Sequence, residues 1–93
     1  MFAIGYYYAV LTIAISKDAL KALERLPADT AARIRAKIGR YARNPKALAN
    51  NVKKLKGREG YRLRVGDQRV IFERDRDTMI VLAIGHRGAI YDE

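Results

Sequence analysis

Strict alternation of apolar and basic side chains over residues 61–65 is the feature that most constrains this chain. Tyr61, Leu63 and Val65 are apolar, and the residues between them are Arg62 and Arg64. Because successive side chains of a β-strand point to opposite faces, this pattern predicts a strand with one buried face and one cationic face. A sheet that carries cations on one face is suited to binding a polyanion.

Two more strands are predicted after this one. Gly66-Asp67 predicts a turn, residues 69–74 a strand, and residues 75–77 a charged hairpin turn. Residues 79–84 form a continuous apolar run, which predicts a central strand covered on both faces. Near the start of the chain, the uncharged residues 10–15 predict a buried strand.

A helical hairpin is predicted between the first strand and the last three. Ser16 is the expected N-cap of the first helix, Pro27 ends it, and Asp29 or Thr30 is expected to cap the second, which ends at Asn44-Pro45. Apolar residues recur at helical spacing, and the expected inward positions are Ala19, Leu20, Leu23, Leu26, Ala31, Ile34, Ile38, Tyr41 and Ala42. The cations Arg33, Lys37 and Arg40 are expected mainly on the outer side.

The order strand, helix, helix and three strands predicts an α+β fold. We expect an N-terminal strand, a helical hairpin and an antiparallel β-meander, with the helices packed on one face of the sheet. The 93 residues predict one domain spanning 1–93, with 1–8 as an N-terminal extension or the product of a misplaced start codon. Residues 1–16 lack a basic n-region and are too short to span a bilayer, so we expect a cytoplasmic protein without a membrane partner.

The composition of the chain limits the classes of partner and cofactor that we expect. Nineteen Lys and Arg against ten Asp and Glu give a net charge of +9, which indicates an acidic partner such as nucleic acid, an anionic membrane or an acidic protein. The absence of Cys excludes disulfides and thiolate metal sites. With a single His and no metal-ligand cluster, we expect neither a metal nor another cofactor.

Three segments together resemble one protein family. They are SKDALKALERLP at 16–27, VKKLKGREGYRLRVGDQRVIF at 52–72 and IGHRGAIY at 84–91. From about residue 11 to residue 91 the chain resembles toxins of the RelE/ParE superfamily of toxin–antitoxin pairs. The resemblance implies a RelE-like fold similar to small microbial ribonucleases. It also implies an acidic antitoxin that is encoded by the adjacent gene and wraps around the toxin. A further implication is a DNA-bound repressor complex formed through that antitoxin.

The two branches of the superfamily imply different activities. RelE-type toxins cleave mRNA in the ribosomal A site, whereas ParE-type toxins share the fold, lack the catalytic set and poison gyrase. The matches to basic residues after the KLKG turn, to an Arg at the start of the next strand and to a final basic residue and Tyr favour the RelE branch. One departure is Gly88-Ala89, where many relatives carry a second charged pair. A C-terminal helix present in some relatives is also missing.

The expected reaction is metal-independent cleavage of RNA by its own 2′-OH. The enzyme must orient that nucleophile, remove its proton, stabilise phosphoryl charge and assist the leaving oxygen. Guanidinium groups suit the phosphate because each binds two oxygens. Tyr91 or His86 is the candidate proton acceptor, and Tyr91 alternatively stacks on a base. The predicted catalytic set is Arg64, Arg69, His86, Arg87 and Tyr91.

A second set of cations is expected to grip RNA phosphates: Lys53, Lys54, Lys56, Arg58 and Arg62. Ordinary structural roles remain open for both sets, such as a solvated strand face for Arg62 and Arg64 or an ion pair for Arg69. The predicted function is therefore a ribosome-dependent mRNA endoribonuclease toxin whose partners are the antitoxin, the ribosome and mRNA. The alternatives are a ParE-like gyrase poison and a basic protein that works only in a repressor complex.

Overall fold

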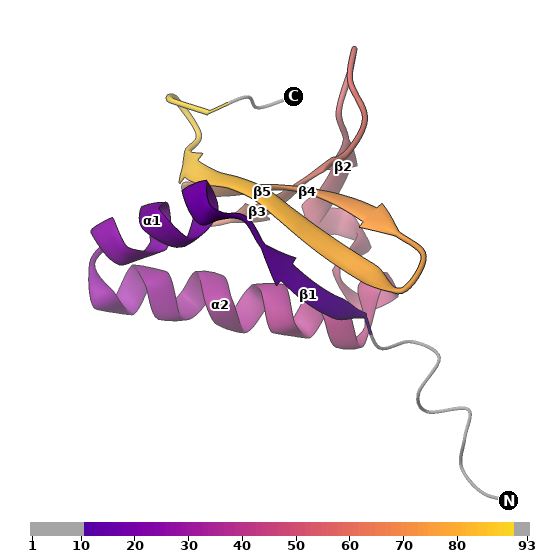
Figure 1. Ribbon diagram of the computed structural model, residues 1–93, viewed down its shortest axis with the longest axis horizontal. Helices are drawn as coiled ribbons and strands as arrows, with labels where there is room; N and C mark the ends of the chain where they lie inside the picture. Colours follow the sequence, from indigo (N-terminus) through magenta and orange to yellow (C-terminus); the bar gives the residue numbers. More distant parts are fainter. Residues whose placement is uncertain (1–10, 91–93) are drawn as a thin grey trace, which may run out of the picture.

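The computed structural model describes residues 11–90, which form an α+β domain (Figure 1). Its five-stranded sheet has the order β1-β5-β4-β3-β2, and both α-helices lie on one face of it, which confirms the predicted fold class. No helix among these residues is long and apolar enough to cross a membrane. The elements are β1 (Thr12–Ile15), α1 (Lys17–Arg25), α2 (Ala28–Arg43), the 3-10 helix η2 (Pro45–Asn51), β2 (Val52–Lys54), β3 (Tyr61–Val65), β4 (Gln68–Asp75) and β5 (Thr78–His86).

The helical hairpin begins as predicted. The Ser16 hydroxyl accepts a hydrogen bond from the backbone N–H of Ala19 at 3.0 Å, which caps α1, and donates one to the Leu82 carbonyl at 2.9 Å. The cap therefore also ties α1 to β5. The predicted cap of α2 is wrong, because Pro27 occupies the N-cap position and no side chain caps that helix. Leu20, expected to be inward, is 42% exposed.

The two sheet positions nearest α1 differ from expectation. β1 pairs in parallel with β5 alone and forms an edge of the sheet, so Thr12, Ile13 and Ala14 are exposed and the prediction of a buried strand is wrong. Residue 10, the predicted start of that strand, lies outside the described residues. β5 lies between β1 and β4 as a central strand should, but Ile80 and its neighbours on the face away from the helices are only half-buried.

The predicted basic connection at residues 46–60 contains two elements that the sequence did not reveal. η2 buries Leu48, and β2 pairs antiparallel with β3, placing Val52 opposite Leu63. β2 is only three residues long and two of these are Lys, so it shows too short an alternation to be recognised. This extra strand gives β3 a neighbour on its outer side.

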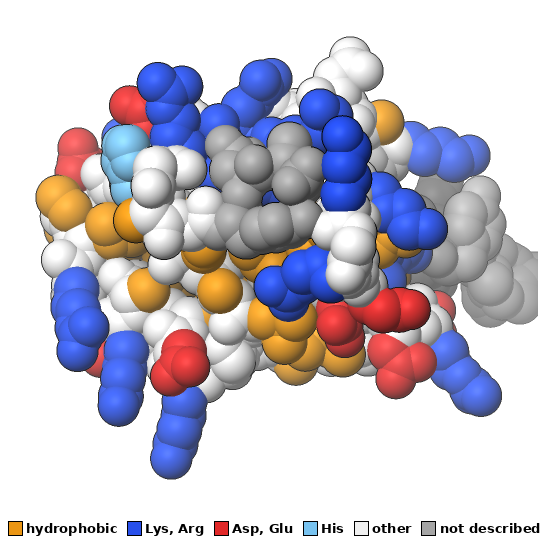
Figure 2. All heavy atoms as spheres, turned by 90° about the horizontal axis from the view of Figure 1, so that it is seen from above, with side chains coloured by type: hydrophobic (Ala, Val, Ile, Leu, Met, Phe, Trp, Pro, Cys, Tyr) orange, Lys and Arg blue, Asp and Glu red, His pale blue; other side chains and the backbone are white. Residues whose placement is uncertain are grey.

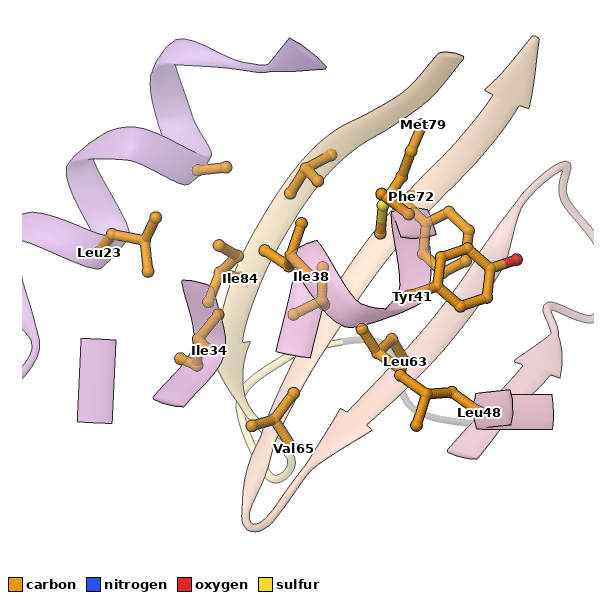
Figure 3. Packing of buried hydrophobic residues seen from close by; sticks show 14 of the residues in the cluster. Leu23, Ile34, Ile38, Tyr41, Leu48, Leu63, Val65, Phe72, Met79 and Ile84 are labelled. Carbon is orange, nitrogen blue, oxygen red and sulfur yellow. The ribbon is translucent and has the colours of Figure 1, made fainter. Parts of the chain in front are cut away.

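The core fills the space between the sheet and α2 (Figure 3). Phe72 of β4 packs between two tyrosine rings, with its centroid 5.0 Å from that of Tyr41 on α2 and 5.4 Å from that of Tyr61 on β3. The predicted inward face of β3 is confirmed, since Leu63 and Val65 are buried in the same cluster. The basic side chains of β3 are thereby left on the opposite face of the sheet.

Candidate functional site

The face of the sheet turned away from the helices carries four aligned cations. The strand registers place Lys53 of β2 opposite Arg62 of β3, and Arg64 of β3 opposite Arg69 of β4. Residues paired across neighbouring strands point to the same face, and so do residues two apart on one strand. Lys53, Arg62, Arg64 and Arg69 therefore form one group, the sheet-face cluster. Figure 2 views this side of the molecule, where blue Lys and Arg side chains gather.

Arg69 is held firmly in this cluster. Its side chain is only 6% exposed, and Nη1 donates hydrogen bonds to the Gly66 carbonyl at 2.9 Å and to the Gln68 carbonyl at 3.1 Å. Both carbonyls belong to the β3–β4 turn, residues 65–68, which Gly66 closes with a φ of 60°. Nη1 of the guanidinium thus holds the turn in place. Because the guanidinium is planar and rigid, this contact also sets the direction of its remaining nitrogens.

Arg87 is attached to the same turn. Its backbone N–H donates a hydrogen bond to the Asp67 carbonyl at 2.9 Å, and its side chain is exposed. The chain then bends, because the N–H of Ile90 donates to the His86 carbonyl at 3.0 Å. This bend brings the Ile90 side chain close to Gly85, where a Cβ would lie 3.4 Å from it. Tyr91 lies outside the described residues.

His86 points to the other side of the sheet. It pairs with Gln68, whose other partner is Val65, so these three residues share the face that carries the helices. The imidazole Nδ1 accepts a hydrogen bond from the backbone N–H of Gly88 at 3.2 Å. The exposed His86 ring therefore lies at the end of β5, beside the α2 side of the β3–β4 turn, whereas Arg69 pairs with Gly85, one residue earlier on the strand.

The predicted phosphate-binding lysines also divide between the two sides. Lys54 is exposed and pairs with Tyr61, which packs against the core, so Lys54 faces away from Lys53. Lys56 and Arg58 belong to the β2–β3 loop, residues 55–60, which rises on the side opposite the helices (Figure 1). The structure brings Lys53 into the sheet-face cluster and leaves the loop cations beside it.

A basic hollow on the helix side of the β3–β4 turn was not anticipated. This α2 pocket measures about 660 Å³, and six of its lining residues are Arg33, Lys37, Arg40, Val65, Gln68 and His86. Burial, together with the charges of Arg40 and Arg64, lowers the pKa of Lys37 from its ordinary value of 10.5. The spacing of the three helix cations by four and three residues was the available signal, because it places them on one face of α2.

The sheet-face cluster offers positively charged side chains at fixed positions as its chemical groups. Arginine side chains bind phosphate oxygens in pairs and keep their charge, so the sheet-face cluster can hold a phosphodiester and stabilise added negative charge on it. Within residues 11–90, no three His, Asp or Glu side chains gather closely enough to hold a metal ion. Arg87, which follows the end of β5, is held near the β3–β4 turn by its backbone contact with Asp67.

Comparison with known proteins places the chain among toxins. Residues 13–91 match the family model described as the ParE toxin of the type II toxin–antitoxin system, parDE. The toxin structure in the archaeal RelE–RelB complex from Pyrococcus horikoshii OT3 is similar at 28% identity and a TM-score of 0.72, over 87% of this chain and 99% of that one. The RelB–RelE complex from Methanococcus jannaschii gives 32% identity and a TM-score of 0.67, over 85% and 95%. No curated protein sequence matches significantly.

Proposed function

Because this chain belongs to the RelE/ParE superfamily of toxins from type II toxin–antitoxin systems, we propose that it is a ribosome-dependent mRNA endoribonuclease. The observation that carries the proposal is the sheet-face cluster, in which Lys53, Arg62, Arg64 and Arg69 come from three adjacent strands and share one face. Such a group of cations suits cleavage of a phosphodiester bond, and a gyrase poison without nuclease activity does not require that chemistry. The similarity to RelE structures supports the same branch.

The proposed reaction is attack of an RNA 2′-OH on the adjacent phosphorus. The bond from phosphorus to the 5′-oxygen breaks, and the products are a 2′,3′-cyclic phosphate and a free 5′-OH. Arg64, Arg69 and Arg87 stabilise the charge that develops on the phosphoryl oxygens. Arg69 is preorganised for this role because the turn carbonyls already fix its guanidinium. Lys53 and Arg62, with Lys54, Lys56 and Arg58 nearby, attract and hold the RNA backbone.

Tyr91 is our preferred candidate for the group that accepts the 2′-OH proton. His86 is the weaker candidate, because it lines the α2 pocket and its register partner is Gln68 rather than Arg69. Replacing Tyr91 by Phe removes the hydroxyl and keeps the ring, so a large loss of rate supports proton transfer. A small loss, combined with a severe effect of Tyr91→Ala, supports base stacking instead.

The antitoxin is the second proposed partner. The similar structures from Pyrococcus horikoshii and Methanococcus jannaschii are complexes of RelE with RelB. A net charge of +9 favours an acidic partner segment and fast, salt-sensitive association. The neighbouring reading frame should encode this protein, and co-expression should give a stable complex that relieves growth arrest. Absence of both effects would contradict a toxin–antitoxin pairing.

A ParE-like gyrase poison is the competing function, favoured by the family model that matches residues 13–91. The deciding experiment incubates the purified full chain with mRNA on programmed ribosomes and, in parallel, with gyrase and relaxed plasmid. We expect cut mRNA with cyclic phosphate ends and unaffected supercoiling. Arg87→Ala should slow cutting by about 10²–10³-fold, as for loss of one preorganised donor. Intact mRNA together with inhibited supercoiling would reject the nuclease.

A further inference from the structure

The α2 pocket concentrates positive charge outside the sheet-face cluster. Arg33, Lys37 and Arg40 line it from one face of α2, spanning about 10 Å along the helix axis. Among residues 11–90, no carboxylate forms an ion pair with any of the three. Asp67 is the one acidic residue in the described lining. The pocket therefore holds an excess of positive charge that an anion would neutralise.

Burial and nearby positive charge both disfavour the ammonium of Lys37, and a bound anion would offset them. The residue is half-buried, and the lowering of its pKa means that its surroundings disfavour the ammonium. The repulsion comes from Arg40 and from Arg64, which is itself a member of the sheet-face cluster. An anion seated between these side chains would replace repulsion by attraction. The charge of Arg64 acts on Lys37, so the α2 pocket and the sheet-face cluster lie within electrostatic range of each other.

The route between the regions runs along the outer edge of β3. β2 begins at Val52, opposite Leu63, so Arg64 lies beyond the end of that strand and has no β2 residue beside it. Its exposed side chain stands at the edge of β3, within electrostatic range of Lys37 on α2. A polyanion bound on the sheet face can pass this edge and reach the pocket without crossing the hydrophobic core.

The polar groups of the pocket suit a ribonucleotide better than a peptide. Gln68 lines the pocket and is half-buried, and its side-chain amide carries donors and an acceptor of the kind that a sugar hydroxyl binds. The apolar lining residues Ile34 and Val65 are already buried in the core. These two side chains therefore offer little surface to an amphipathic peptide. The volume of about 660 Å³ is within the range of roughly 300–1,000 Å³ for small-ligand sites.

We propose that the α2 pocket is a second RNA-binding site, which takes a phosphate and ribose of the same strand that crosses the sheet-face cluster. The inference rests on the proposed function for the identity of the polymer. Arg33, Lys37 and Arg40 bind the backbone phosphates, and the side-chain amide of Gln68 forms a hydrogen bond with a ribose hydroxyl. The pocket binds and orients the RNA strand, whereas cleavage takes place on the other side of the β3–β4 turn.

The test compares two double variants that lose the same charge. Arg33→Ala/Arg40→Ala removes two pocket cations, and the control Lys21→Ala/Arg35→Ala removes two exposed cations that do not line the pocket. Fluorescence anisotropy measures binding of each full-length chain to a labelled single-stranded RNA, whose integrity is checked on a gel. We expect the pocket variant to bind at least about tenfold more weakly. Its slope of log affinity against log salt should fall by about 1.4, the value for two single-strand phosphate contacts.

The control variant should lose less than about threefold in affinity and keep a steeper salt slope. Equal losses in the two variants, or an unchanged pocket variant, would overturn the inference. So would a pocket variant that loses affinity for an oligoglutamate peptide but not for RNA, because that result assigns the pocket to a protein partner. Should Arg33→Ala/Arg40→Ala fail to fold, Arg33→Gln/Arg40→Gln provides the same test.

Cleavage by the unaltered chain on programmed ribosomes is measured separately. If the chain cleaves mRNA but its RNA binding does not depend on the pocket, the proposed RNA site is contradicted and the nuclease is not. Pocket-dependent RNA binding without cleavage contradicts the nuclease and leaves the pocket as an RNA site. The two proposals therefore fail in different experiments.

Discussion

Replacing Arg69 by Lys should destabilise the fold although the charge is kept. The Arg69 side chain is 6% exposed and donates two hydrogen bonds, at 2.9 and 3.1 Å, to carbonyls of the β3–β4 turn. A hydrogen bond to a charged group contributes about 1.5–3 kcal/mol, and a lysine ammonium can restore one of the two, so the expected loss is about 1.5–3 kcal/mol. In a domain of this size each kcal/mol lowers the melting temperature by about 4–8 °C, which gives a decrease of roughly 6–24 °C.

The matched control is Arg74→Lys, the same change at an exposed position near the other end of β4. It should lower the melting temperature by less than about 2 °C, because exposed charges contribute little. Circular dichroism melts of the three proteins measure this difference. An unchanged melting temperature for Arg69→Lys, or equal decreases in the two variants, would refute the structural role of the fork.

The same variant also tests how the turn supports catalysis. The Asp67 carbonyl of that turn holds the backbone of Arg87 at 2.9 Å, so loosening the turn should displace Arg87 and slow cleavage. The assay is cleavage of mRNA on programmed ribosomes well below the melting temperature of the variant. A destabilised Arg69→Lys protein that cuts at the unaltered rate would show that neither the Arg69 fork nor the turn geometry matters for the reaction.

Three further changes test the loop, the strand register and the pocket. Gly60→Ala should lower the free energy of unfolding by about 3 kcal/mol in denaturant titrations, because φ is 112° and a Cβ would lie 3.0 Å from a β4 carbonyl oxygen. Gly66→Ala, at a φ of 60° with open space around the Cβ, should lower it by only about 1 kcal/mol. Lys53→Ala should weaken RNA affinity more than Lys54→Ala in anisotropy titrations, since only Lys53 faces the sheet-face cluster, and equal losses would contradict that register. Lys37→Gln should raise stability slightly near neutral pH and lower RNA affinity. Its lowered pKa means that the charged form is disfavoured on folding, so the stability gain should shrink as pH rises from the folded-state pKa towards 10.5, and melts across this pH range would expose a gain of the opposite sign.

Local sequence patterns were sufficient for most elements. The alternation around Arg62 and Arg64 predicted both the strand and the side of the sheet on which the arginines lie. Ser16 predicted the start of α1, and Gly66-Asp67 predicted the β3–β4 turn. These signals depend on residues a few positions apart, and the physics that they report, capping, turn geometry and side-chain period, is equally local.

The position of His86 shows where local patterns fail. Counting by twos from the buried Met79 places His86 on the cationic face, opposite the helices. The register instead shifts in the β4–β5 pair, where Ile71 pairs with Ala83 but Phe72 pairs with Val81, so β5 holds one extra residue. This bulge reverses the alternation of everything that follows it and turns His86 towards α2.

The sequence by itself determined an α+β toxin-like chain with a cationic strand face, because period and charge are properties of neighbouring residues. Only the tertiary structure decided which cations meet. Pairing register sets Arg64 opposite Arg69, and the packing of α2 under the sheet brings Lys37 within electrostatic range of Arg64. Lys37 and Arg64 are 27 positions apart in the sequence, and the geometry of both pairs depends on strand pairing and layer packing that no single segment encodes.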